Sequence, residues 1–187
     1  MRKVKRNEVV DYQTYEESRN ETRPNILAQK KVRRVHVGHH LTFLFENHNT
    51  IRYQIQEIMR TEKIVKEADI QHEIKVYNEL IGDDGELGCT LLVEIPTEEG
   101  RNELLTRWKN LNADLYLKLE NGQKVKPTWD ERQIGDQRLS SVQYLRFDTR
   151  GQTPVAIGCT FDAPELFGET ALSPETIAAF DADLQDN

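Results

Sequence analysis

A change of apolar periodicity near residue 48 most constrains what this chain can fold into. Over residues 34–46 apolar and polar side chains alternate on both sides of Gly38-His39-His40, which is the pattern of a β-hairpin. From residue 50 the apolar side chains recur at helical spacing instead. They are Ile51, Ile55, Ile58, Met59 and Val65, and they predict one long helix over about residues 50–68. A chain that changes period in this way predicts a sheet with helices packed on it.

The rest of the chain repeats both patterns. Alternating segments predict further strands over residues 87–95, 115–119, 124–129, 142–147 and 154–161. Helices are predicted over residues 7–31, with Pro24 as a break, over 71–80 and 98–111, and from Ser173-Pro174-Glu175 onward. The sum is an α+β fold with a mostly antiparallel sheet of about six or seven strands and about four helices.

Charge is distributed unevenly along the sequence. None of the 25 Lys and Arg residues lies after residue 150, whereas seven of the 32 Asp and Glu residues do, so the net charge of −7 belongs to residues 151–187. We therefore expect a single α+β domain over residues 1–168, followed by an acidic extension over residues 169–187 with a short helix. On this interpretation, removal of the extension leaves the domain folded.

Composition excludes several classes of protein. No segment approaches the roughly 18 to 20 apolar residues that span a bilayer, and no apolar stretch follows the basic N-terminus as it does in a signal peptide. A sequence pI near 5.3 lacks the basic footprint of a nucleic-acid-binding protein. Cys89 and Cys159 lie singly in apolar segments, which predicts buried, unreactive thiols. We expect a cytoplasmic protein with no membrane or nucleic-acid partner.

Histidines are concentrated around the predicted hairpin, where four of the five lie between residues 36 and 48. Neutral imidazole is the commonest side-chain ligand for transition metals. Glu62 falls on the apolar stripe of the predicted helix, where a carboxylate must be paired, protonated or bound to a metal. One hypothesis is a metal- or haem-binding enzyme or carrier for iron, zinc or haem, with ligands from His36, His40, His48, Glu46 and Glu62. In the alternative, the turn histidines bind nothing and Glu62 reaches solvent or an arginine.

A second kind of site is predicted from polar donors on a helix and on a strand. Arg52 and Gln54 lie on the predicted long helix, and Tyr144 and Arg146 on the strand over residues 142–147. If these four side chains converge in one cleft, the protein is a small-anion-binding enzyme. Otherwise they are solvated faces. No Gly-rich phosphate loop, Gly-x-Ser-x-Gly elbow or His-Glu-x-x-His motif identifies a reaction.

Four segments, residues 31–47, 50–60, 77–81 and 141–147, together resemble an uncharacterised bacterial family, the domain of unknown function numbered 3501. The family has no established activity or catalytic residues, and its pattern favours His40 over His39. Its genes often stand beside rubrerythrin and an iron–sulfur oxidoreductase. The resemblance therefore implies a cytoplasmic accessory protein of redox or peroxide metabolism, which acts by docking to a rubrerythrin or an iron–sulfur partner.

Overall fold

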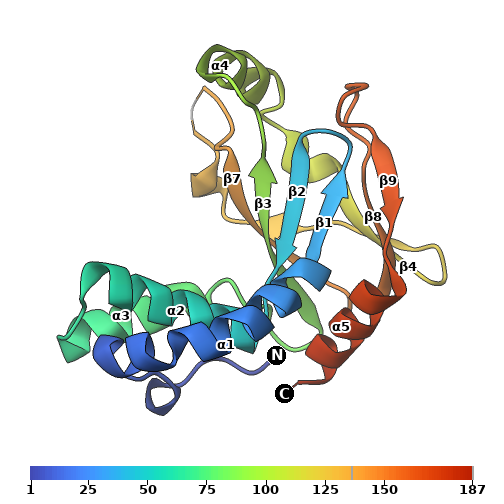
Figure 1. Cartoon of the computed structure of the whole chain (residues 1–187). Helices are drawn as coiled ribbons and strands as arrows, with labels where there is room; N and C mark the ends of the chain where they lie inside the picture. The colour runs from blue at the N-terminus through green and yellow to red at the C-terminus, as the bar shows by residue number, and fades with distance from the viewer. Residues whose placement is uncertain (136, 187) are drawn as a thin grey trace.

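Two antiparallel sheets form the centre of the computed structural model, which describes residues 1–135 and 137–186 (Figure 1). Sheet A contains, in spatial order, β1 (Arg34–Val37), β2 (Leu41–Phe45), β3 (Glu86–Val93), β7 (Val142–Asp148) and β6 (Thr128–Trp129). Sheet B contains β5 (Lys124–Val125), β4 (Leu115–Leu119), β8 (Pro154–Cys159) and β9 (Gly168–Ala171). The predicted α+β class is confirmed.

The sheets meet at both edges. At one edge β1 lies beside β9, where the Thr170 hydroxyl donates to the carbonyl of His36 over 2.7 Å. At the other edge the chain passes directly from β5 to β6 through Lys126 and Pro127. This passage divides the predicted strand over residues 124–129 between the two sheets, because Pro127 has no N–H with which to continue the ladder.

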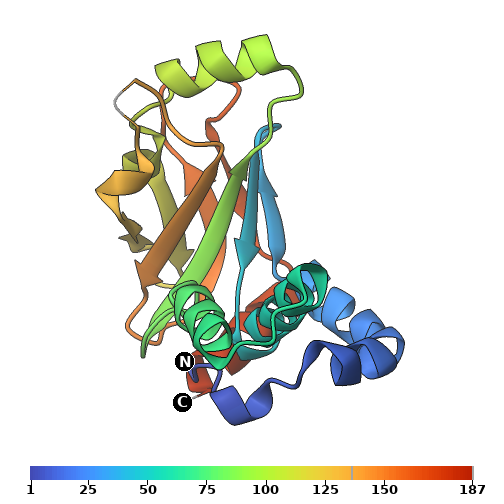
Figure 2. The same cartoon turned by 90° about the vertical axis from the view of Figure 1, so that its left-hand side faces the viewer.

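Five α-helices surround the sheets in the part of the chain that the structure describes. α1 (Tyr12–Val32), α2 (His48–Glu62) and α3 (Glu67–Asn78) form a layer beside one end of sheet A, and α4 (Glu98–Arg107) lies at its opposite end (Figures 1 and 2). α5 (Pro174–Gln185) closes the end where the two chain termini lie together. Short 3₁₀ turns occupy Arg6–Glu8, Leu111–Asp114 and Glu131–Gln133. No described helix has the length and apolar character needed to cross a membrane.

The hairpin is confirmed residue by residue. β1 and β2 pair with Val35 opposite Phe43 and Val37 opposite Leu41, and these four side chains are buried together with Phe45. This register decides which face of the sheet each side chain occupies, because successive residues of a strand point to opposite faces. On β7, Gln143, Leu145 and Phe147 face the core, while Tyr144 and Arg146 face outward.

The helix predicted over residues 50–68 is shorter in the structure, and the next helix, predicted over residues 71–80, begins earlier, at Glu67. α2 ends where Lys63 adopts a left-handed conformation with a φ of 52°. The N–H of Ile64 donates to Met59 and that of Lys63 to Arg60, which is the Schellman arrangement of a helix end. Val65, assigned by its spacing to the buried stripe, is 70% exposed. Conversely, Pro24 lies inside α1 rather than breaking it, because α1 is mostly exposed and water reaches the carbonyl that the proline leaves unpaired.

The acidic segment 169–187, predicted as an extension, is instead built into the core over its described residues. β9 pairs with β8, and the Phe180 side chain is fully buried against Phe45, with ring centroids 4.6 Å apart. Asp183 forms a buried ion pair with Arg33. The buried face of α5 contains Phe180 and Leu184 together with Thr176 and the paired Asp183. The high negative charge of the segment made this face hard to recognise in the sequence.

Deletion of residues 169–187 is therefore expected to abolish folding. The deletion removes β9 and Phe180 and leaves the Arg33 charge buried without its partner. Loss of a core phenylalanine alone costs about 3–5 kcal/mol, and a typical domain is stable by only about 5–15 kcal/mol. We expect no near-ultraviolet circular dichroism and no cooperative urea transition from the truncated chain, whereas full-length Phe180→Ala stays folded with lower stability. Cooperative unfolding of the truncated chain would show instead that residues 169–187 are an extension outside the folded domain.

Candidate functional site

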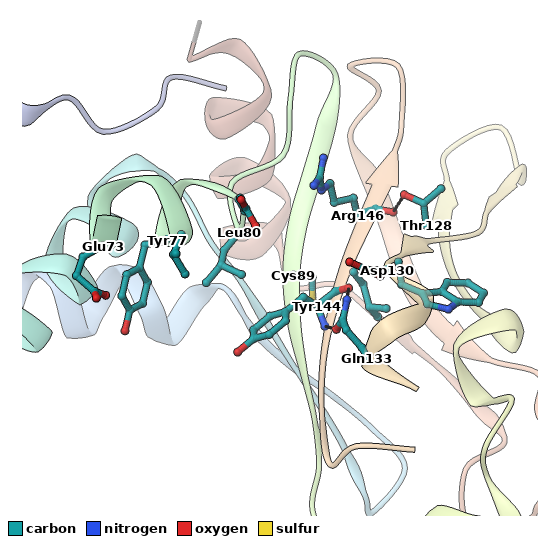
Figure 3. Close-up of a pocket in the computed structure, with 13 residues that line it drawn as sticks. Glu73, Tyr77, Leu80, Cys89, Thr128, Asp130, Gln133, Tyr144 and Arg146 are labelled. Atoms are coloured by element: carbon teal, nitrogen blue, oxygen red, sulfur yellow. Dashed lines mark hydrogen bonds between the residues drawn. The ribbon is translucent and has the colours of Figure 1, made fainter. Parts of the chain in front are cut away.

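A recess with a volume of about 650 Å³ lies between α3 and sheet A (Figure 3). We call it the α3 recess. On the helix side it is lined by residues of α3 and of the turn that follows it, namely Glu73, Val76, Tyr77, Glu79 and Leu80. On the sheet side the lining residues are Cys89, Thr128, Trp129, Asp130, Gln133, Tyr144, Leu145 and Arg146. Its volume lies within the range of about 300–1,000 Å³ that is usual for ligand sites.

The helix wall is one face of α3, held in place at one end. Positions 73, 76, 77 and 80 are spaced at three- and four-residue steps, so they share a face, while Ile70 and Ile74 are buried on another. Just past the end of α3, the chain lies directly on β3, because Gly88 has no side chain there. A Cβ atom at Gly88 would come within 2.0 Å of the Leu80 carbonyl oxygen.

Lys3 fixes the same end of α3. Its ammonium group donates to the carbonyl oxygens of Asn78 and Gly82 over 3.3 Å each, and also to that of Ile81. A cation beside the last carbonyls of a helix is favourable, since these groups have no partner within the helix and carry the negative end of its dipole. The N-terminal segment therefore positions the helix wall.

Gln133 positions the strand wall. Its side-chain amide donates to the Tyr144 carbonyl over 3.2 Å and accepts from the Tyr144 N–H over 2.6 Å, so it pairs with β7 as another strand would. These bonds fix the main chain at Tyr144, and the alternation of β7 directs its side chain outward, toward Tyr77 and Leu80 on the opposite wall (Figure 3). Both walls leave apolar surface open, since Tyr144 is 46% and Val76 42% exposed.

The α3 recess is electrically negative. Glu73, Glu79 and Asp130 line it together with one cation, Arg146. Arg146 already lies 3.6 Å from the carboxylate of Asp83, whereas neither Glu73 nor Glu79 has an ion-pair partner among the residues that the structure describes. Burial raises the pKa of the Tyr77 hydroxyl, and the negative charge of Glu73 raises it further. Tyr77 therefore remains a neutral phenol at physiological pH.

The predicted metal ligands do not come together as one group. His36 and Glu94 both contact the Thr42 hydroxyl, over 2.8 and 2.9 Å, and His40 lies near them with its Nδ1 atom 2.8 Å from the Glu94 carbonyl oxygen. His48 lies elsewhere, on α2, with its Nε2 atom 3.0 Å from Glu8. Over residues 1–135 and 137–186, no three His, Cys, Asp or Glu side chains are grouped so as to hold a metal ion.

The two candidate carboxylates have different environments. Glu62 is exposed at the end of α2. The Glu46 side chain is only 2% exposed, with Lys30 at 3.9 Å, and its Oε2 atom has no hydrogen-bond partner. Burial raises the pKa of Glu46, and the nearby charge of Lys30 only partly opposes this effect. Glu46 is thus a buried acid under the helices, outside the α3 recess.

The four predicted anion-binding residues are divided. Tyr144 and Arg146 line the α3 recess, but Arg52 is exposed on α2 and Gln54 donates to Glu46 over 3.4 Å. Alternation along β7 therefore placed two of the four predicted residues on the outward face that lines the recess. The helix wall was missed, because Glu73 and Tyr77 are ordinary residues for an exposed helix and carry no signal of a site.

Both cysteines are buried, as predicted. Burial raises the pKa of Cys89 well above its usual range, and it raises the pKa of Cys159 to about 11. Neither thiol is therefore a ready nucleophile at neutral pH, although Cys89 belongs to the floor of the α3 recess.

Comparisons with known proteins show the family and assign no activity. A family model described as "Protein of unknown function (DUF3501)" matches residues 3–184. A crystal structure of a protein of unknown function from Burkholderia pseudomallei is similar, with a TM-score of 0.85 and 30% sequence identity. The match covers 98% of this chain and 100% of the other. No curated protein matches the chain.

Glu46 is expected to make stability depend on pH. Its pKa is higher in the folded state than in the unfolded chain, so its contribution is favourable at low pH and is lost as pH rises through the folded pKa. In urea unfolding, the free energy of unfolding of Glu46→Gln should therefore rise relative to that of the wild type between about pH 4 and pH 8. Lys30→Met should steepen the decline, because the ammonium group opposes the shift. Parallel pH curves for all three proteins would contradict this account.

Glu73→Gln is expected to lower the pKa of Tyr77, because it removes a negative charge that favours the neutral phenol. The measurement is a titration of tyrosinate absorbance, with the contribution of Tyr77 obtained by difference from the same proteins carrying Tyr77→Phe. A Tyr77 titration that is identical with and without the Glu73 charge would show that the two groups do not interact.

Proposed function

Since the chain belongs to the DUF3501 family of proteins of unknown function, we propose that it is a cytoplasmic accessory protein of redox or peroxide metabolism that docks to a rubrerythrin or an iron–sulfur partner through the α3 recess. The metabolic setting rests on the gene context that the family resemblance implies. The docking surface rests on the geometry of the recess.

The observation that carries the docking proposal is the exposed Tyr144 at the centre of the α3 recess. Tyrosine, tryptophan and arginine supply most of the binding energy in protein interfaces, where they lie in pockets surrounded by polar residues. The sheet side of the recess presents two of these residue types, as Tyr144 and Arg146, which both face outward on β7. The carboxylates of Glu73 and Glu79 form a polar boundary on the helix side.

The acidic charge supports a directed encounter. Unpaired carboxylates attract a basic surface and accelerate association, and salt weakens this effect. The recess alone is smaller than a stable protein interface, which buries about 1,200–2,000 Å² in total. The contact would therefore extend from the recess over the outer face of sheet A, where Thr90 and Arg146 lie beside Tyr144 on neighbouring positions.

Tyr144→Ala is expected to weaken docking by about 2 kcal/mol or more, or about 30-fold in Kd, because it removes the central aromatic anchor. Binding of rubrerythrin and of the iron–sulfur oxidoreductase from the same genome is measured by calorimetry at low and high salt. Phe167→Ala is the matched control, because Phe167 is another exposed aromatic residue and does not line the recess.

We expect binding to one of the two proteins, weakened by salt and by Tyr144→Ala but not by Phe167→Ala. If neither protein binds at low salt, the proposed partners are wrong. If both variants weaken binding equally, docking does not use the α3 recess.

A further inference from the structure

The α3 recess contains two negative charges for which the chain supplies no counterion. Glu73 and Glu79 line it without an ion-pair partner within the described part of the chain. The cation on the opposite wall, Arg146, already lies beside Asp83. When a partner covers the recess and excludes water, an uncompensated carboxylate costs several kcal/mol. A covering group that brings a positive charge offsets this cost, and it is the best electrostatic match for the half-buried Glu73 and the exposed Glu79.

Aromatic and aliphatic surface lies beside these charges. Tyr77 is one helical turn from Glu73 on the same wall, and Tyr144 projects toward them from β7 (Figure 3). Tyrosine rings attract cations through the negative potential of their faces. Val76 and Leu80 add apolar surface on the helix wall, which suits the methylene stem of a long basic side chain.

The arrangement favours a guanidinium over an ammonium group. A guanidinium is planar, so it stacks on a tyrosine ring while its edge donates to carboxylates, and its five N–H groups reach several acceptors at once. The recess presents both requirements, with two tyrosine rings and the Glu73 and Glu79 carboxylates. An ammonium group is a compact charge that keeps its water more strongly.

From these observations we propose that the α3 recess is a binding site for an arginine side chain, supplied by the partner protein. The inference rests on the proposed docking function for the source of the arginine. Its chemistry depends only on Glu73, Glu79, Tyr77 and Tyr144.

The test uses the full-length protein and three peptides of one sequence that differ at a central position, which is arginine, lysine or citrulline. Citrulline has nearly the shape of arginine without its charge. Binding is followed by nuclear magnetic resonance titration, in which the amide signals of residues 73–80 and 144–146 report the site. We expect the arginine peptide to bind at least tenfold more tightly than the citrulline peptide, with the lysine peptide between them.

Glu73→Gln is expected to weaken arginine binding about threefold to tenfold, because it removes one charged acceptor from a partly exposed site. Glu99→Gln is the matched control, since Glu99 is exposed at the start of α4 and does not line the recess. Circular dichroism of both variants checks that the fold is unchanged. Equal binding of the arginine and citrulline peptides, or equal effects of the two variants, would overturn the proposal.

The outcomes separate this inference from the proposed function. If the arginine peptide binds in the recess but neither redox protein does, the arginine site stands and the proposed function fails. If a redox protein binds in a Tyr144-dependent manner and the arginine peptide does not displace it, docking stands and the arginine site fails.

Discussion

A buried ion pair between Arg33 and Asp183 joins two segments of the chain that lie 150 residues apart in the sequence. Arg33 Nε and Nη2 donate to the two carboxylate oxygens over 2.7 and 2.9 Å, and Asn47 donates to the same carboxylate over 2.8 Å. Removing two charges from water is costly, and good geometry with further hydrogen bonds is required to offset that cost. Arg33 follows α1, Asn47 caps α2 and Asp183 lies on α5, so the network is complete in one relative position of these helices. Because α3 packs on α2, the helix wall of the α3 recess depends on this network too.

Local patterns predicted most of the strands, including β3 and β7, which pair with each other across 50 or more residues. They failed for the acidic C-terminal segment, where β9 was missed and a contact with a distant residue holds the helix in the core. The alternation from Val35 to Phe45 specified a hairpin with the correct face inward. Nothing near Asp183 indicates that its partner lies 150 residues earlier, so an acidic helix with few apolar residues resembled an appendage. Likewise, the end of α2 depends on a left-handed conformation at Lys63, a residue type that carries no signal for it.

The same limit explains how much of the site was visible in the sequence. Tyr144 and Arg146 stand out because they are outward positions on an alternating strand. Glu73 and Tyr77 are ordinary residues for an exposed helix, and they become part of a site because Gly88 lets the end of α3 approach β3. For the histidines, proximity in the sequence does not correspond to proximity in the structure. His40 and His48 are eight positions apart but belong to opposite ends of β2, where they contact Glu94 and Glu8 respectively.

The way α3 is anchored also bears on how the recess works. Lys3 and Gly88 hold its C-terminal end against sheet A, and Ile70 and Ile74 pack into the core, so its position does not depend on any bound partner. Tyr144 is similarly held by Gln133. A site whose walls are fixed before binding loses little conformational freedom when it is filled. Because the walls stand apart, Tyr144 and Val76 leave apolar surface in contact with water, which is unfavourable. A partner that covers both residues removes this surface from water, and the gain in free energy contributes to binding.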